Sequence, residues 1–127
     1  HPTEVAAVLT MARTVAGEGK VHVIFQPHLY SRTVTFADQF ATALSKADTV
    51  ILTEIYRARE NYRTDVTSEI VTDQIDGARY VPQMADAARE IAAAAAPGDL
   101  VLTLGAGDIT TLAPAIVAAL DLHLGSP

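Results

Sequence analysis

The chain has 127 residues, and its 15 acidic side chains outnumber its 9 basic ones to give a formal net charge of -6. This length corresponds to one domain, and a chain of this size buries about two-thirds of its unfolded surface, enough for a core without disulfides or metals. The acidic balance argues against duplex nucleic-acid binding, which depends on clustered Lys and Arg. We therefore expect small molecules or proteins as partners.

Cysteine is absent, which excludes disulfides, thiolate metal sites and a cysteine nucleophile. No apolar run approaches the about 20 residues of a membrane span, and the N-terminus lacks a signal-peptide pattern, so we expect a cytoplasmic protein with no membrane partner. The chain opens with His1-Pro2, and Pro2 with Glu4 resembles the first turn of a helix already under way. We interpret the sequence as part of a longer protein.

The first half of the chain predicts two helices, each followed by a strand. Helical spacing of apolar residues covers 2–16, and Gly17 and Gly19 end that helix. Residues 21–25 are a short β-branched strand. The second helix carries Phe36, Phe40 and Leu44, and the second strand is 49–53.

The second half begins with a long polar connection over 54–65 and a short helix around Ile70 and Val71. A weak strand follows at 80–81, and a helix over 84–95 is stopped by Pro97-Gly98. The clearest strand is 100–104. A final helix runs from about 111 to 122, with Pro114 tolerated in its first turn.

Helices that alternate with short apolar strands are typical of an α/β fold. We predict an open, doubly wound, mostly parallel sheet with helices on both faces. Ligands of such sheets bind beyond the carboxyl ends of the strands, so the segments that follow the strands are the candidate site.

Polar residues gather at this carboxyl edge. His28 and Arg32 follow the first strand. The basic residues Arg57, Arg59 and Arg63 follow the second, and the segment from Gly105 to Thr110 follows the last. His1 belongs to the same edge, because a helix antiparallel to the strands begins where they end.

Each of these features also has a plain structural interpretation. His28 is equally well explained as a hydrogen-bonded turn histidine, although Arg32 four residues later favours a shared ligand. The segment 57–63 could be merely solvated. Gly105 and Gly107 are expected in a tight turn with positive φ, and Ser31 or Thr33 is expected as a helix N-cap rather than a nucleophile. His22 and His123 are interpreted as structural.

Several known nucleotide-binding and catalytic motifs are excluded by the sequence. The Gly105-x-Gly107 pattern reaches Thr110 where a dinucleotide fingerprint requires Gly or Ala. The sequence Gly17-Glu18-Gly19-Lys20 precedes a strand, and Thr14 replaces the first glycine of a P-loop. No spacing typical of metal ligands, of a catalytic triad or of a phospho-acceptor receiver domain is present. We assign no catalytic and no metal-binding residue.

Four segments together carry a family resemblance: His1-Pro2-Thr3-Glu4, Phe25 to Thr33 (FQPHLYSRT), Tyr56-x-Ala58-x-Glu60, and Gly105 to Ile109 (GAGDI). In this order, and over essentially the whole chain, they resemble the Rossmann-like C-terminal domain of the Mur ligase family. The stretch 25–33 is the specific part, and it is similar to the members that join L-alanine to UDP-N-acetylmuramate.

The resemblance implies a three-domain, ATP-dependent cytoplasmic enzyme of peptidoglycan precursor synthesis. Its N-terminal domain would hold the UDP-sugar, its central domain would bind ATP and Mg, and neither domain is in this chain. ATP would phosphorylate the carboxylate of UDP-N-acetylmuramate, and the amine of L-alanine would attack the acyl phosphate. This third domain alone is expected to be inactive.

By position, the resemblance implies that L-alanine is bound by His28, Arg32, Tyr30 and His1. It further implies nucleotide or phosphate contacts at Arg57, Arg59, Arg63 and Asp108. Leu29 stands where many relatives have arginine, so either Arg32 suffices or a loop arginine substitutes. Two alternatives stay open: a Mur-type ligase that adds a different amino acid or a peptide, and a stand-alone α/β small-molecule binding module.

Overall fold

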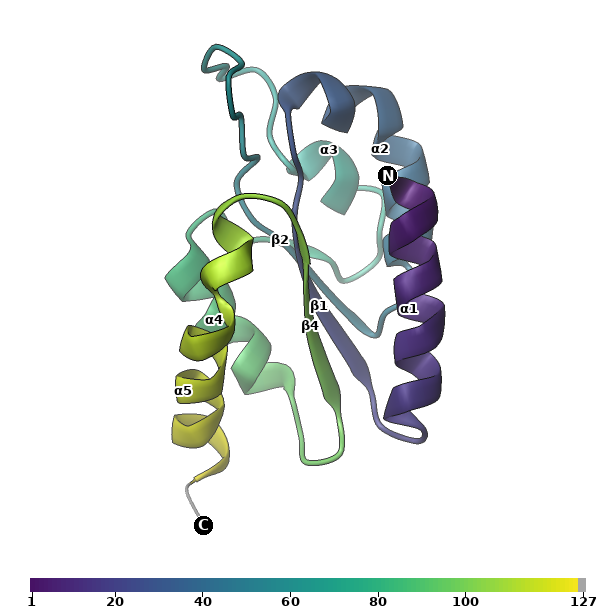
Figure 1. Ribbon diagram of the computed structural model, residues 1–127, viewed down its shortest axis with the longest axis vertical. Coiled ribbons are helices and arrows are strands. Elements are labelled where there is room, and N and C mark those ends of the chain that lie inside the picture. The colour runs from purple at the N-terminus through teal and green to yellow at the C-terminus, as the bar shows by residue number, and fades with distance from the viewer. Residues whose placement is uncertain (126–127) are drawn as a thin grey trace.

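The computed structural model describes residues 1–125, and helices alternate with strands along them (Figure 1). No helix among these residues is long and apolar enough to cross a bilayer. In chain order the elements are α1 (Pro2–Ala16), β1 (Val21–Gln26), α2 (Tyr30–Leu44), β2 (Thr49–Leu52), α3 (Glu69–Thr72), β3 (Arg79–Tyr80), α4 (Met84–Ala94), β4 (Leu100–Gly105), the 3-10 helix η1 (Asp108–Thr111) and α5 (Ala113–Leu124).

The strands form one parallel sheet in the order β3-β2-β1-β4. Strand β1 pairs on both sides, with Ile24 opposite Ile51 of β2 and Thr103 of β4. All six residues of β1 are buried, whereas those of the edge strand β4 are half-buried or exposed. The predicted α/β class and parallel sheet are therefore confirmed.

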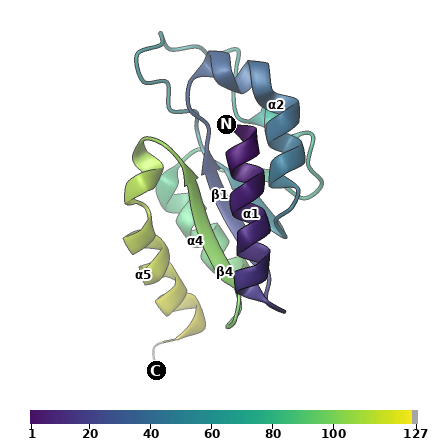
Figure 2. The same cartoon turned by 45° about the vertical axis from the view of Figure 1, so that its right-hand side comes forward.

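Helices cover both faces of the sheet, as expected for strands that are apolar throughout. Helices α1, α2 and α3 pack on one face against Val23 and Phe25 of β1, and α4 and α5 pack on the other against Ile24. Figure 1 shows α1 and α2 on one side of the sheet and α4 and α5 on the other. Figure 2 shows that α1 starts at the end of the molecule where the strands finish.

The order of the strands reverses at β1. From β1 the chain adds β2 and then β3 on one side, and the crossover through α4 returns it to the other side of β1, where β4 pairs. The carboxyl ends of β1 and β4 therefore border a topological switch point, the place where open α/β sheets bind ligands.

Helix α2 differs most from the sequence-based expectation. It begins at Tyr30, although its apolar pattern was clear only from Phe36. Neither Ser31 nor Thr33 is the N-cap, so that prediction is wrong. Leu29 occupies the N-cap position, and its side chain makes no capping hydrogen bond.

At the opposite end of the sheet, buried His22 has the structural role expected of it. Its Nδ1 lies 2.8 Å from the hydroxyl of Thr49, and its Nε2 lies 2.8 Å from a carboxylate oxygen of Asp99. Asp99 also accepts hydrogen bonds from the backbone N–H groups of Lys20 and Ala96. The hydrogen bond with His22, followed by those two N–H groups, holds the pKa of Asp99 well below its usual range.

We expect Asp99→Asn to lower the thermal midpoint at about pH 7 and to weaken the acid dependence of stability. Because folding lowers the pKa of Asp99, its stabilising effect is complete above the ordinary value of 3.8 and is lost as the pH falls below it. Urea unfolding between about pH 2 and about pH 7 measures this effect. Asp76→Asn, which changes an exposed loop acid, should leave the acid dependence unaltered, and equal behaviour of the two variants would contradict the prediction.

Candidate functional site

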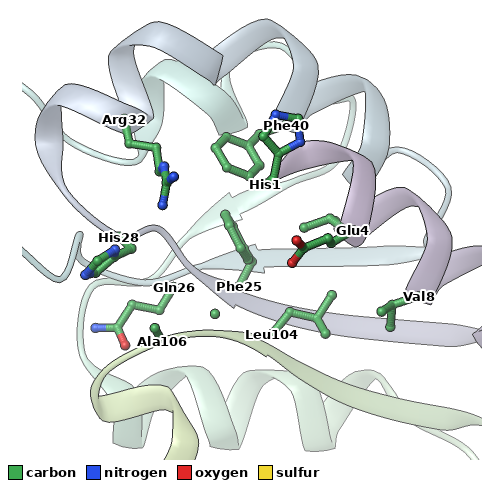
Figure 3. A pocket seen from close by; sticks show the side chains of 12 residues that line it. His1, Glu4, Val8, Phe25, Gln26, His28, Arg32, Phe40, Leu104 and Ala106 are labelled. Carbon is green, nitrogen blue, oxygen red and sulfur yellow. The ribbon is translucent and has the colours of Figure 1, made fainter.

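A cavity of about 320 Å³ lies at the switch point, between the carboxyl ends of β1 and β4 and the first turns of α1 and α2. Figure 3 shows the side chains around it. We call it the switch-point cavity; it is lined by His1, Glu4, Val5, Val8, Phe25, Gln26, His28, Arg32, Phe40, Leu104, Gly105 and Ala106.

The walls of the switch-point cavity combine opposite charges with apolar surface. The guanidinium of Arg32 enters from α2, and the carboxylate of Glu4 enters from α1 on another side (Figure 3). Phe25 and Leu104 form much of the apolar floor. Within residues 1–125, neither Arg32 nor Glu4 has an ion-pair partner, so both charges are available to a ligand.

The chain reaches the cavity through a tight corner that follows β1. His28 pairs with Tyr56 as an isolated parallel bridge. The N–H of Tyr56 donates to Pro27 O at 2.9 Å, and the N–H of Leu29 donates to Tyr56 O at 2.8 Å. The His28 and Tyr56 rings stack with centroids 5.9 Å apart and an interplanar angle of 17°. The loop after β2 therefore holds His28 in place.

Leu29 has a φ of 69° and a ψ of 136°. A positive φ is unusual for a branched side chain and costs about 1–3 kcal/mol, so the neighbouring contacts must impose it. Its N–H is bound to Tyr56, and its carbonyl accepts from both the N–H and the hydroxyl of Thr33, at 3.1 and 2.7 Å. These bonds set the direction in which α2 leaves the corner, and with it the reach of Arg32.

Glu60 supplies the N-terminal cap that α2 lacks in its own sequence. One carboxylate oxygen accepts from the N–H groups of Tyr30 and Ser31 at 2.5 and 3.3 Å, and the other accepts from the Ser31 hydroxyl at 2.5 Å. The Ser31 hydroxyl bond is the main reason that the pKa of Glu60 is lowered. A loop residue thus stabilises the helical turn that carries Arg32.

The glycine that ends β4 and the one two residues later allow three segments to approach closely. Gly105 and Gly107 have φ values of 124° and 94°. A Cβ on Gly105 would collide with the backbone oxygen of Gln26, and a Cβ on Gly107 would lie 2.6 Å from the Tyr56 ring. Buried Gln26 also accepts a hydrogen bond from the N–H of Ile109 at 2.9 Å, so the loops after β1, β2 and β4 form one unit.

A second cavity, of about 580 Å³, lies on the other side of this unit, near the start of α4. Arg57 and Asp108, two of the expected phosphate contacts, both line it. Arg59 is exposed on the loop, and Arg63 is paired with Asp65 at 2.7 Å outside both cavities. The four expected phosphate contacts are therefore not brought to one place.

The expected amino-acid contacts are largely brought together. His1, His28 and Arg32 all line the switch-point cavity. Tyr30 does not: its ring is buried with Ile55 and Val66 and borders the second cavity, because position 30 begins α2 on the side facing the core.

Glu4 was not among the expected site residues. The argument that placed His1 at the carboxyl edge would have placed Glu4 there too, one turn into α1. No group of three or more His, Asp or Glu side chains in the described part of the chain is arranged to hold a metal ion.

A family model described as "Mur ligase, glutamate ligase domain" matches residues 1–107. The chain belongs to the Mur ligase family. Three relatives are named UDP-N-acetylmuramate--L-alanine ligase, from Paenarthrobacter aurescens, Saccharopolyspora erythraea and Mycolicibacterium paratuberculosis, with identities of 52%, 45% and 48%. The matches cover 94%, 99% and 97% of this chain but 26% of each relative, so the chain spans about a quarter of the length of these Mur ligases.

A solved structure supports the Mur ligase fold. It is a domain of a Haemophilus ducreyi protein described as a UDP-N-acetylmuramate:L-alanyl-gamma-D-glutamyl-meso-diaminopimelate ligase. The TM-score is 0.68 at 21% identity, and the match covers 94% of this chain and 84% of that one.

We expect Gly107→Ala to destabilise the domain more than Gly77→Ala. Both glycines have positive φ, but only Gly107 would bring its Cβ against another residue, the Tyr56 ring, whereas nothing lies within 4 Å at Gly77. The steric part should add about 1–3 kcal/mol to the conformational cost that both variants share. Chemical denaturation measures the free energy of unfolding of both variants. If both variants lose the same free energy of unfolding, the Tyr56 ring moves aside at no cost and the prediction is wrong.

Proposed function

We propose that this chain is the amino-acid-positioning C-terminal domain of a cytoplasmic UDP-N-acetylmuramate–L-alanine ligase, and that L-alanine binds in the switch-point cavity. The names of the relatives support the reaction. The observation that carries the site is the unpaired guanidinium of Arg32, which faces a small cavity together with His28.

In the proposed reaction, ATP and Mg are bound mainly by another domain of the same protein. ATP would transfer its terminal phosphoryl group to the carboxylate of UDP-N-acetylmuramate and leave as ADP. The amine of L-alanine would then attack the acyl phosphate, and the amide would form with loss of a proton and inorganic phosphate. The residues described here do not suit the metal, since they include neither a P-loop nor a metal-ligand cluster. The contribution of this chain is therefore to bind and orient the amino acid.

Arg32 suits this task for a geometric reason. A guanidinium presents a planar fork of N–H donors that matches a carboxylate, so Arg32 would hold the amino acid through its carboxylate and not through the nitrogen that attacks. His28 is oriented by its stacking on Tyr56 and offers a second polar contact. Positioning of this kind accounts for a large share of rate acceleration without an acid or base in this domain.

We further propose that Arg57 and Arg59 contact phosphate groups of the nucleotide or UDP-sugar when the domains close. Both side chains are exposed on the loop after β2, and Asp108 lies with Arg57 around the second cavity. Arg63 is the weaker candidate, because its guanidinium donates two hydrogen bonds to Asp65.

In the full-length enzyme we expect Arg32→Ala to raise the KM for L-alanine by about ten- to hundredfold and to leave the KM for ATP nearly unchanged. The reason is that a charge-assisted, two-pronged contact is lost only at the amino-acid site. Arg32→Lys should recover part of the loss, since an ammonium restores the charge without the fork. Steady-state kinetics with each substrate varied in turn measure these effects.

Three outcomes would contradict parts of this proposal. If Arg32→Ala leaves the KM for L-alanine unchanged, Arg32 has only a structural role, and the amino-acid site must be sought in the loop after β2. A panel of amino acids and peptides in the same assay tests the alternative that a related ligase uses a different substrate. Absence of ligase activity with every acceptor would favour a binding module.

For the loop, we expect Arg57→Ala and Arg59→Ala together to raise the KM for ATP or for UDP-N-acetylmuramate and to flatten its dependence on salt. Attraction between exposed charges is screened beyond about 10 Å at about 0.1 M salt, so a loss of phosphate contacts should matter most at low salt. The measurement is KM over a salt series. Arg89→Ala, on the exposed side of α4, is the matched control; if neither KM moves, the loop is merely solvated.

A further inference from the structure

We propose that Glu4 pairs with the ammonium group of the incoming amino acid, so that the switch-point cavity recognises the zwitterion and not the carboxylate alone. This inference rests on the proposed function. Glu4 is a residue of the first turn of α1, and its carboxylate borders the same cavity as the guanidinium of Arg32 (Figure 3).

The first observation is charge complementarity. Arg32 and Glu4 carry opposite charges, and neither is neutralised by an ion pair within residues 1–125. An α-amino acid carries one carboxylate and one ammonium, so a cavity lined by one cation and one anion offers a partner for each group. The Glu4 side chain is exposed in the domain alone and stays hydrated there, so a ligand with a carboxylate alone would gain nothing from Glu4.

The second observation is that packing between the helices fixes where the two charges lie. The ring of His1 caps α1, because its Nδ1 accepts a hydrogen bond from the N–H of Thr3. The same ring packs against Phe36 of α2, with ring centroids 5.2 Å apart. Phe36 in turn meets Phe40 edge-on at 6.4 Å. Glu4 on α1 and Arg32 on α2 are therefore held on two helices that pack directly against each other.

The third observation concerns the space beside the two charges. Val8, Phe25 and Leu104 present apolar surface to the same cavity. A methyl side chain gains from such a surface, whereas a charged side chain would lose hydration there. The combination favours a small apolar amino acid.

A simpler role for Glu4 is to stabilise its own helix, because an acid in the first turn interacts favourably with the helix dipole. Within the described residues, the Glu4 carboxylate accepts no hydrogen bond from the backbone N–H groups of α1. The two roles make different predictions for ligands, since a helix-stabilising residue would not distinguish between ligands with and without an ammonium group.

The test compares L-alanine with L-lactate, which keeps the carboxylate and the methyl group but has a hydroxyl in place of the ammonium. In the full-length enzyme, Glu4→Gln should raise the KM for L-alanine about tenfold and leave the Ki of L-lactate, measured as a competitive inhibitor, nearly unchanged. Glu4→Asp keeps the charge and should recover part of the affinity. Glu18→Gln makes the same charge change beyond the other end of α1 and should alter neither constant.

The possible results separate this inference from the proposed function. An unchanged KM for L-alanine in Glu4→Gln, or equal weakening of L-alanine and L-lactate, would overturn the role of Glu4. If Arg32→Ala weakens both ligands in the same assays, the proposed amino-acid site still stands. If Arg32→Ala weakens neither ligand, the site itself is wrong. Thermal unfolding of each variant shows whether a loss of binding reflects loss of the fold, and Glu4→Asp decides the question if Glu4→Gln unfolds.

Discussion

The parallel pairing of β1 with strands on both of its sides is the constraint on which the rest of this structure depends. Parallel neighbours cannot be joined by tight turns, so each connection must cross the sheet through a helix. Every strand then ends at the same rim. The chain leaves β1 toward one face of the sheet, where α2 packs, and leaves β4 toward the other face, where η1 and α5 pack. The segments that follow β1 and β4 therefore separate and leave the switch-point cavity at the ends of these two strands. The site is thus a consequence of strand order.

The loops after β1, β2 and β4 turn this open rim into a defined site. Gln26 ties the first loop to the last, and the ring of Tyr56 packs between His28 and the backbone at Gly107. Glu60 fixes the first turn of α2, which carries Arg32. The residues that face the cavity therefore depend in part on Tyr56 and Glu60, which do not line it.

Sequence reasoning succeeded where the determining interactions are local or follow from topology. The helices and strands came from the spacing of apolar residues, and the place of His1 came from the direction of α1. Reasoning from sequence failed where the partner is distant in the chain. The cap of α2 is supplied by Glu60, 29 residues beyond Ser31, and no local pattern could reveal it. Similarly, Tyr30 turns toward the core to pack with Ile55 and Val66, which come much later in the chain. The pairing of Arg63 with Asp65 is different, because the two residues are close in sequence and only the conformation of the loop shows that their side chains meet.

The positive φ of Leu29 limits which residues can replace it. A valine, isoleucine or threonine at this corner would add a second branch at Cβ to a backbone that already disfavours any side chain. Glycine would relieve the strain in the folded state, but it would also increase the conformational freedom of the unfolded chain and so offset part of the gain. The substitutions that this half-buried position tolerates are thus set by its backbone more than by the chemistry of its side chain.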